Sequence, residues 1–200
     1  MIRLACIVLA ALALPAVPAA SQTLRFSTVV IDAGHGGKDG GSVWNGLIEK
    51  RLCLDVAKRV EAGLKSRGIK TVMTRRTDTF VELDQRARIA NRVPSSVFVS
   101  IHFNGSRKTI ISGGETYYRS PRGKILASAI SRSIKSKVPG GSRGIFDADY
   151  KVLRETQMPA VLVECGYISN KREAARCADP AHRQKLADAI VSGLLAVRAR

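Results

Sequence analysis

Two histidines and two glutamates of this 200-residue chain occupy positions from which they could act on one substrate. His35 follows the segment TVVID, His102 follows VFVSI and Glu164 follows AVLV, and each of these apolar segments is predicted to be a β-strand. Glu49 begins the first long predicted helix. Because ligands bind at the carboxyl ends of strands in open α/β sheets, side chains that follow different strands can converge on one point. Such convergence predicts a metal site.

Imidazole nitrogens and carboxylate oxygens are ligands of catalytic zinc, which takes three from the protein and keeps a fourth position for water. We predict that His35, Glu49 and His102 are these ligands. The glycines around His35, in AGHGGKDGG, leave room for an ion and allow a tight turn. Taken singly, His35 could be a polar loop residue and Glu49 a first-turn acid stabilised by the helix dipole. The donor set suits zinc without excluding other divalent ions.

Glu164 is the candidate catalytic acid and base. It ends the apolar run PAVLVE, where a buried charge without a partner would be costly. Beside a metal, it would take a proton from the water that attacks a carbonyl and return one to the leaving amine. The alternative is a strand-end carboxylate bonded to backbone N–H groups. The third histidine, His182, has polar neighbours in the last predicted helix and is expected on the surface.

Periodicity in the rest of the chain predicts the elements that position these side chains. Short β-branched or aromatic segments predict strands at residues 28–32, 70–74, 97–101, 115–118 and 160–163. Apolar residues at helical spacing predict helices at residues 50–67, 82–91 and 124–137, and a last helix that is capped by Asp179 and begins at Pro180. This alternation of strands and helices favours a layered α/β domain with a mostly parallel sheet.

The length is that of one ordinary domain, so we predict a catalytic domain at residues 21–200 behind a signal peptide at residues 1–20. The N-terminal segment has a positive charge at Arg3, an apolar run over residues 4–14 and small residues before Ser21, as signal peptides do. The alternative is a short membrane anchor, although the run is too short to cross a bilayer. We expect export to the periplasm, or otherwise to the cell wall or the medium.

Removal of the signal peptide would leave three cysteines without a repeated CxxC spacing, so we expect no thiolate metal site. Cys165 and Cys177 bracket a short segment and could form a disulfide in an oxidising compartment. Cys53 falls on the apolar face of a predicted helix, where it is expected to be a small buried side chain.

The composition is strongly basic, because 33 Lys and Arg residues against 16 Asp and Glu residues give a formal net charge of +17. Such a surface attracts polyanions and loses that attraction in salt. The basic residues are scattered over every predicted helix, and only 5% of the residues are aromatic, which argues against nucleic acid as the partner. Anionic polymers of the cell envelope are the expected partners.

Several motifs in a fixed order resemble one enzyme family. They are VVIDAGHGGKDGG, the glutamate of LIEKRLCLD, TRRTD with RARIAN, SIHFN, and VLRETQMPAVLVECGYISN, and the resemblance covers about residues 28–197. The chain resembles the zinc-dependent N-acetylmuramoyl-L-alanine amidases of the amidase_3 type. The resemblance implies a single α/β domain whose central mixed, mostly parallel sheet is flanked by helices. It also implies that His35, Glu49 and His102 bind zinc and that Glu164 is the catalytic glutamate.

The reaction implied by the resemblance is hydrolysis of the amide between N-acetylmuramic acid and the L-alanine of the stem peptide in peptidoglycan. One zinc ion per chain would polarise the carbonyl and activate water, while Glu164 moves the protons. Arg143, next to a glycine-rich loop, is a candidate contact for stem-peptide carboxylates, or else a solvated loop charge. The alternatives are a zinc peptidase that cuts within the stem peptide and a non-catalytic, basic wall-binding module.

Regulation is expected to differ from that of the division-associated relatives. Those amidases carry an inserted helix that blocks the zinc, whereas GGETYYRSPRGKILAS passes here from strand to helix with almost no insertion. We therefore expect a monomer without a built-in inhibitory helix and without need of an activator protein. Phe103 follows His102 where a small residue is common in the family, which would narrow the cleft.

The positive charge generates a prediction about cell-wall binding. We expect no separate wall-binding domain in a chain of this length, so the basic surface is expected to replace one. Binding of the purified protein to sacculi should weaken steeply between about 0.01 M and about 0.15 M NaCl, where the Debye length falls from about 30 Å to about 8 Å. Cosedimentation at several salt concentrations measures the bound fraction, and binding that does not respond to salt would contradict the prediction.

Overall fold

A six-stranded sheet forms the middle of the structure, a computed structural model that describes residues 23–199. The strand order is β4-β1-β5-β8-β6-β7, in which β6 runs antiparallel to β8 and the other neighbours are parallel. The strands of this sheet are β1 (Thr28–Ala33), β4 (Lys70–Met73), β5 (Ser96–Asn104), β6 (Gly114–Tyr118), β7 (Ser142–Asp147) and β8 (Ala160–Tyr167). A separate hairpin pairs β2 (Val43–Trp44) with β3 (Leu47–Ile48). The predicted mixed, mostly parallel sheet is confirmed.

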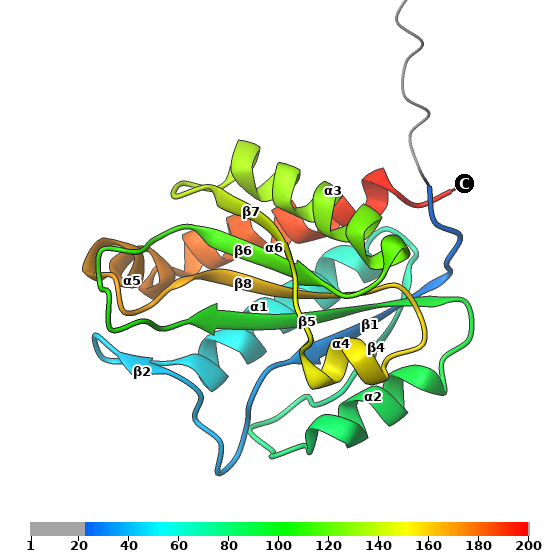
Figure 1. Cartoon of the computed structure of the whole chain (residues 1–200), viewed down its shortest axis with the longest axis horizontal. Coiled ribbons are helices and arrows are strands. Elements are labelled where there is room, and N and C mark those ends of the chain that lie inside the picture. The colour runs from blue at the N-terminus through cyan, green and yellow to red at the C-terminus, as the bar shows by residue number, and fades with distance from the viewer. Residues whose placement is uncertain (1–22, 200) are drawn as a thin grey trace, which may run out of the picture.

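Helices cover both faces of the sheet (Figure 1). They are α1 (Glu49–Lys65), α2 (Leu83–Asn91), α3 (Pro121–Lys137), α4 (Lys151–Glu155), α5 (Lys171–Ala178) and α6 (Pro180–Ala196). The larger apolar cluster lies where α1, α3 and α6 pack on one face. A smaller cluster, which includes Val30, Phe98 and Leu162, lies under α2 and α4 on the other face. The central strands are therefore apolar on both faces, as expected for covered parallel strands.

The strands that carry the candidate site are longer than the sequence predicts. β5 and β8 continue past the predicted ends, so His102 and Glu164 lie inside strands rather than after them. The polar residues in SIHFN and ECGY interrupt the apolar pattern and so conceal the continuation. The sequence analysis also missed five other elements. β7 is a partly exposed strand at the sheet edge, β2 and β3 have 2 residues each, and α4 and α5 have 5 and 8 residues.

The start of α6 confirms one prediction and corrects another. Asp179 caps the helix, since its side chain accepts a hydrogen bond from the backbone N–H of Ala181 at 2.8 Å, and Pro180 is the first helical residue. His182 was expected on the surface, but it is only 6% exposed. Only Asp179 separates α5 from α6, so the first turn of α6 packs close to α5. Burial lowers the pKa of His182, and the charge of Arg176 lowers it further.

The cysteines of the described residues are all buried free thiols. Cys53 is completely buried, as predicted, and Cys165 and Cys177 are not joined by a disulfide. The predicted signal peptide at residues 1–20 lies outside the described residues. Within residues 23–199, no helix combines the length and the apolar character needed to cross a membrane.

The packing of α6 against α3 depends on Gly193. A Cβ at this position would lie 2.6 Å from Cα and 2.8 Å from N of Ile130, which are backbone atoms. Gly193→Ala should lower the free energy of unfolding by about 1–3 kcal/mol through overpacking, although alanine favours the helix by about 1 kcal/mol. Urea denaturation measures the change.

Gly63→Ala in α1 is the matched control for this substitution. The nearest atom to the added Cβ would be a side-chain methyl, Cγ2 of Val191, at 3.1 Å. Because a side chain yields more readily than a backbone, the control should remain within about 1 kcal/mol of the wild type. Equal losses in the two variants would show that the helix contact at Gly193 is not the cause.

Candidate metal centre and active site

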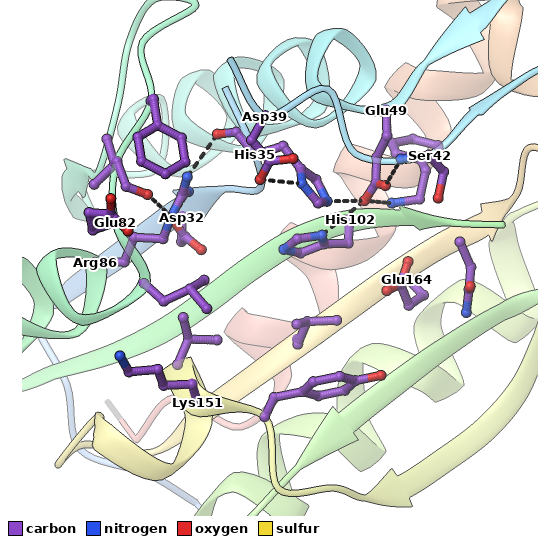
Figure 2. A pocket seen from close by; sticks show the side chains of 18 residues that line it. Asp32, His35, Asp39, Ser42, Glu49, Glu82, Arg86, His102, Lys151 and Glu164 are labelled. Carbon is purple, nitrogen blue, oxygen red and sulfur yellow. Dashed lines mark hydrogen bonds and ion pairs between the residues drawn. The ribbon is translucent and has the colours of Figure 1, made fainter. Parts of the chain in front are cut away.

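The ligand atoms of His35, Glu49 and His102 converge at the sheet edge, as predicted. Nε2 of His35 and Nδ1 of His102 each lie 2.9 Å from Oε1 of Glu49. One ligand atom from each residue can be chosen so that all three lie within 4.8 Å of one another. Figure 2 shows the two imidazoles and the carboxylate pointing toward one another, with Glu164 on the neighbouring strand. This donor set and spacing match a site for one metal ion.

The loop after β1 holds His35 in a conformation that few residues adopt, with φ of 58°. Its Nδ1 lies 2.8 Å from Oδ2 of Asp39, which orients the ring so that Nε2 faces Glu49. The other oxygen of Asp39 accepts a hydrogen bond from the backbone N–H of Gly41 at 3.0 Å. The loop backbone therefore holds the carboxylate of Asp39, which in turn orients the imidazole of His35.

Two buried arginines bind the backbone carbonyls of the same loop. Arg75 donates to the carbonyl oxygens of Ala33 at 2.8 Å and Gly34 at 2.6 Å. Arg86 donates to those of Ala33 at 2.6 Å and His35 at 2.8 Å. Three successive carbonyls thus bind guanidinium groups, and the backbone on both sides of Gly34 is held in place. The sequence analysis did not identify either arginine.

Asp32 compensates the charge of Arg86 in a pair that is almost completely buried, with Oδ1 2.7 Å from Nη1. The hydroxyls of Thr74 and Ser100 donate to the same carboxylate at 2.6 Å each. Burial alone would raise the pKa of Asp32, but the charge of Arg86 and these hydrogen bonds outweigh burial and lower the pKa. Asp32 is therefore ionised at neutral pH.

Glu49, the first residue of α1, is held by backbone N–H groups from two other segments. Oε2 accepts from Ser42 at 2.8 Å, and Oε1 accepts from Phe103 at 3.1 Å. Burial raises the pKa of Glu49, but the hydrogen bonds and charges of His102 and His35 outweigh it and lower the pKa. Burial lowers the pKa of His35, but the hydrogen bonds and charges of Glu49 and Asp39 outweigh burial and raise the pKa. A fixed, ionised carboxylate between two imidazoles is a strong site for a cation.

Glycines leave the space that the ligand side chains occupy. A Cβ at Gly34 would collide with the imidazole ring of His102. At Gly41 a Cβ would lie 2.6 Å from Oε2 of Glu49 and 2.7 Å from Cδ2 of His35. These clashes agree with the interpretation that the glycines around His35 make room for the site.

Glu164 pairs in register with His102 of the adjacent strand and lines the same cleft as the three candidate ligands. Its Oε2 is buried without a hydrogen-bond partner among the described residues. The alternative in which backbone N–H groups satisfy this carboxylate is therefore wrong for that oxygen. Burial raises the pKa of Glu164 well above its usual value, and the charges of Glu49 and Glu115 raise it further. Such a carboxyl is suited to accept and return a proton.

A second buried glutamate, Glu115, lies directly opposite Glu164 in the β6–β8 pair and was missed by the sequence analysis. Its Oε2 accepts hydrogen bonds from the hydroxyls of Tyr117 at 2.6 Å and Tyr167 at 3.0 Å. Its Oε1 accepts from Nε of Arg143 at 2.7 Å. Arg143 is thus bonded to the neighbour of Glu164 rather than solvated alone in a loop. The available signal was a glutamate in the aromatic strand segment ETYY, where a buried charge needs a partner.

The candidate ligands and Glu164 line one cleft with a volume of about 490 Å³. The segment before α2, the start of α2 and the start of α4 also line the cleft, through Phe80, Leu83, Tyr150 and Lys151. The backbone of Phe103 borders the cleft, but its side chain is completely buried in the larger apolar cluster. The ring that was expected to narrow the cleft is therefore part of the core.

The fold is that of amidase catalytic domains of known structure. The catalytic domain of CwlV, an N-acetylmuramoyl-L-alanine amidase from Bacillus (Paenibacillus) polymyxa var. colistinus, superposes with a TM-score of 0.82 at 40% identity and covers 86% of this chain and 100% of that domain. The N-acetylmuramoyl-L-alanine amidase AmiC2 of Nostoc punctiforme has a TM-score of 0.81 at 40% identity, covering 84% of this chain and 94% of that one.

Sequence comparison defines the family. The family model Amidase_3, described as N-acetylmuramoyl-L-alanine amidase, matches residues 29–196, so this chain belongs to that family. The uncharacterised protein YqiI of Bacillus subtilis is 40% identical over 179 residues, which are 88% of this chain and 86% of YqiI. The N-acetylmuramoyl-L-alanine amidase LytC of the same organism is 36% identical over 170 residues, which are 83% of this chain and 34% of LytC.

The buried pair behind the His35 loop generates a prediction about stability and pH. Asp32→Asn leaves Arg86 buried without its counter-charge and should lower the free energy of unfolding by about 3–5 kcal/mol at pH 7. Because the folded-state pKa of Asp32 is lowered, its contribution is complete above the unfolded pKa of about 3.9 and disappears as the pH falls through the folded value. The difference between the proteins should therefore shrink below about pH 4.

Urea denaturation at several pH values between neutral and acid measures this difference. Asp84→Asn, which removes an exposed partner of Arg88 on α2, is the control and should change stability little at any pH. A loss for Asp32→Asn that stays constant into acid would contradict the role of the ionised carboxylate.

Proposed function

We propose that this protein is a zinc-dependent amidase that hydrolyses the bond between N-acetylmuramic acid and the L-alanine of the peptidoglycan stem peptide. The proposal depends on one observation: His35, Glu49 and His102 offer ligand atoms within 4.8 Å of one another, in the same cleft as Glu164. Membership of the Amidase_3 family supports the choice of substrate, since LytC and CwlV are named for this reaction.

The side chains of the site fit zinc in their chemistry. Two imidazole nitrogens and one carboxylate oxygen are a frequent donor set of catalytic zinc sites. The carboxylate of Glu49 is buried and ionised, and Oε2 of Glu164 nearby is buried without a partner, so a cation would balance the negative charge of the cleft. A bound zinc ion supplies Lewis-acid polarisation of the scissile carbonyl and a lowered pKa for water. We propose one zinc ion per chain, held by His35, Glu49 and His102.

Glu164 is the proposed general base and then general acid. Its carboxylate takes a proton from the attacking water and returns it to the amide nitrogen, which leaves as the amino group of L-alanine. Burial and neighbouring carboxylates give Glu164 a high proton affinity, which favours the acceptance of the proton. Because Oε2 has no partner among the described residues, this oxygen needs to break no hydrogen bond first.

The proposed setting is the cell envelope. The N-terminal signal-peptide pattern supports export, to the periplasm or to the cell wall, and one relative, LytH of Staphylococcus aureus, is named a probable cell wall amidase. The net charge of +17 suits anionic wall polymers, and Arg143 is a proposed contact for substrate carboxylates. Only Arg119 and Ser120 separate β6 from α3, which leaves no room there for a blocking helix. We propose a monomer that acts without an activator.

The decisive prediction concerns Glu164→Gln. This variant should retain about one zinc ion per chain by metal analysis, while kcat on purified peptidoglycan falls by about 100- to 10,000-fold. The purified wild-type protein alone should clear peptidoglycan, lose this activity to a chelator and regain it with zinc. Mass spectrometry of the products should show glycan strands with free muramoyl carboxyl groups and intact peptides with N-terminal alanine.

Glu155→Gln in α4 removes a carboxylate that pairs with Lys151 and is the control, with activity expected near that of the wild type. Loss of zinc from the Glu164 variant would identify this residue as a ligand instead of the base. Products cut within the stem peptide would identify a zinc peptidase, and a wild-type protein that binds sacculi without releasing any product would identify a wall-binding module.

A further inference from the structure

A β-bulge in β7 lies at Arg143, whose side chain reaches across to the carboxylate of Glu115 on the neighbouring strand β6. The register of β6 with β7 shifts between Gly114 and Glu115, which pair with Ser142 and Gly144. Arg143 therefore has no partner residue of its own, and bulges of this kind redirect side chains next to active sites. Nε of Arg143 lies 2.7 Å from Oε1 of Glu115, a residue on the same strand pair as Glu164.

Glu115 is a fixed anchor for this arginine. Its side chain is 6% exposed, and its second oxygen accepts hydrogen bonds from Tyr117 and Tyr167 at 2.6 and 3.0 Å. A carboxylate that is bonded from three sides cannot turn to follow a mobile side chain. The hydrogen bond from Nε therefore fixes the position of the Arg143 side chain beside the Glu115 carboxylate.

The rest of the Arg143 guanidinium remains available. A guanidinium has five N–H donors, and only Nε of Arg143 has a hydrogen-bond partner among the described residues. The side chain is 43% exposed, so the Nη1 and Nη2 groups are accessible to a ligand. Their planar arrangement suits a carboxylate, which can accept two parallel hydrogen bonds.

The pairing of Glu115 with Glu164 places the Arg143 guanidinium within a few peptide residues of the reacting groups. Residues directly opposite one another in an antiparallel pair have Cβ atoms about 5 Å apart, so Glu115 lies one side-chain width from Glu164. The guanidinium lies next to Glu115, on the side of β7. An extended peptide advances by about 3.5 Å per residue, so a carboxylate within the first few residues after the scissile amide can reach it.

We infer that Arg143, positioned by Glu115, selects substrates that carry a free carboxylate on the peptide side of the scissile amide over those that carry the carboxamide. The inference rests on the proposed function and specifies its substrate. A carboxamide of the same shape is neutral and cannot form the charge-assisted pair with Nη1 and Nη2. Glu115 is a positioning residue here, and Arg143 is the specificity residue.

The test uses two muramoyl peptides that are identical except for a carboxylate or a carboxamide at this position. The zinc-loaded wild type should show a lower KM for the carboxylate form. Arg143→Ala should raise KM for the carboxylate substrate by about 10- to 100-fold while kcat, and both constants for the carboxamide, change little. Arg92→Ala removes an equal charge at the C-terminal end of α2, away from Arg143, and should leave both substrates unaffected.

Glu115→Gln keeps an acceptor for the two tyrosines but frees Arg143, so it should reduce the preference for the carboxylate without matching the effect of Arg143→Ala. Thermal unfolding of each variant verifies that it is folded. If Arg143 serves only to neutralise Glu115, Arg143→Ala will lower kcat or stability and affect both substrates alike, and this result would overturn the inference.

Binding to the Glu164→Gln protein separates the two proposals, because it needs no turnover. Calorimetry should give a lower Kd for the carboxylate peptide than for the carboxamide, and adding Arg143→Ala should abolish the difference. An equal Kd for both peptides with Arg143 present would overturn the inference even if the wild type is an active amidase. Absence of amide hydrolysis by the wild type would instead contradict the proposed function.

Discussion

The arrangement of the site depends on the hydrogen bonds from Arg75 and Arg86 to the three carbonyls that follow one another at the end of β1. A chain that leaves a buried strand and turns sharply exposes carbonyl oxygens that no strand or helix satisfies, and each would be costly to bury alone. The guanidinium groups satisfy them in place of water. His35 can therefore keep a positive φ and present its imidazole at the sheet edge.

These hydrogen bonds bury positive charge, which the surrounding residues must balance. A buried guanidinium needs a counter-charge, and Asp32 supplies it for Arg86 with the help of two hydroxyl groups. On the cleft side, Glu49, Glu115 and Glu164 bring three carboxyl groups close together, in a protein whose net charge is +17. Two of them have cationic or imidazole partners, and Glu164 has none within residues 23–199. The cleft thus combines a place for a cation with a carboxyl group that favours its protonated form.

The sequence predicted the parts of this arrangement that follow from strand ends and residue type. Buried parallel strands are apolar throughout, so a histidine or glutamate after such a strand is conspicuous, and His35, His102 and Glu164 were identified in this way. Glu49 followed from the start of the adjacent helix. The fold class followed from the alternation of strands and helices. All four side chains line the same cleft in the structure.

The residues that support the site were not predictable, because their roles depend on contacts between distant segments. Arg75 and Arg86 look like surface charges until the loop carbonyls that they bind are placed in space. His182 was expected on the surface because its neighbours in sequence are polar, but α5 lies against that turn. β7 has no clear alternation because its bulge interrupts the two-residue period.

The two candidate histidine ligands and Arg143 lie at different parts of the sheet. β1 and β5, which lead to or carry the histidines, are inner strands with neighbours on both sides, whereas β7 is an outermost strand with one neighbour. Changes in the length or composition of an edge strand disturb few other residues, because it has only one neighbouring strand. The sequence around Arg143 could therefore change among related proteins without disturbing the inner strands that lead to or carry His35, His102 and Glu164.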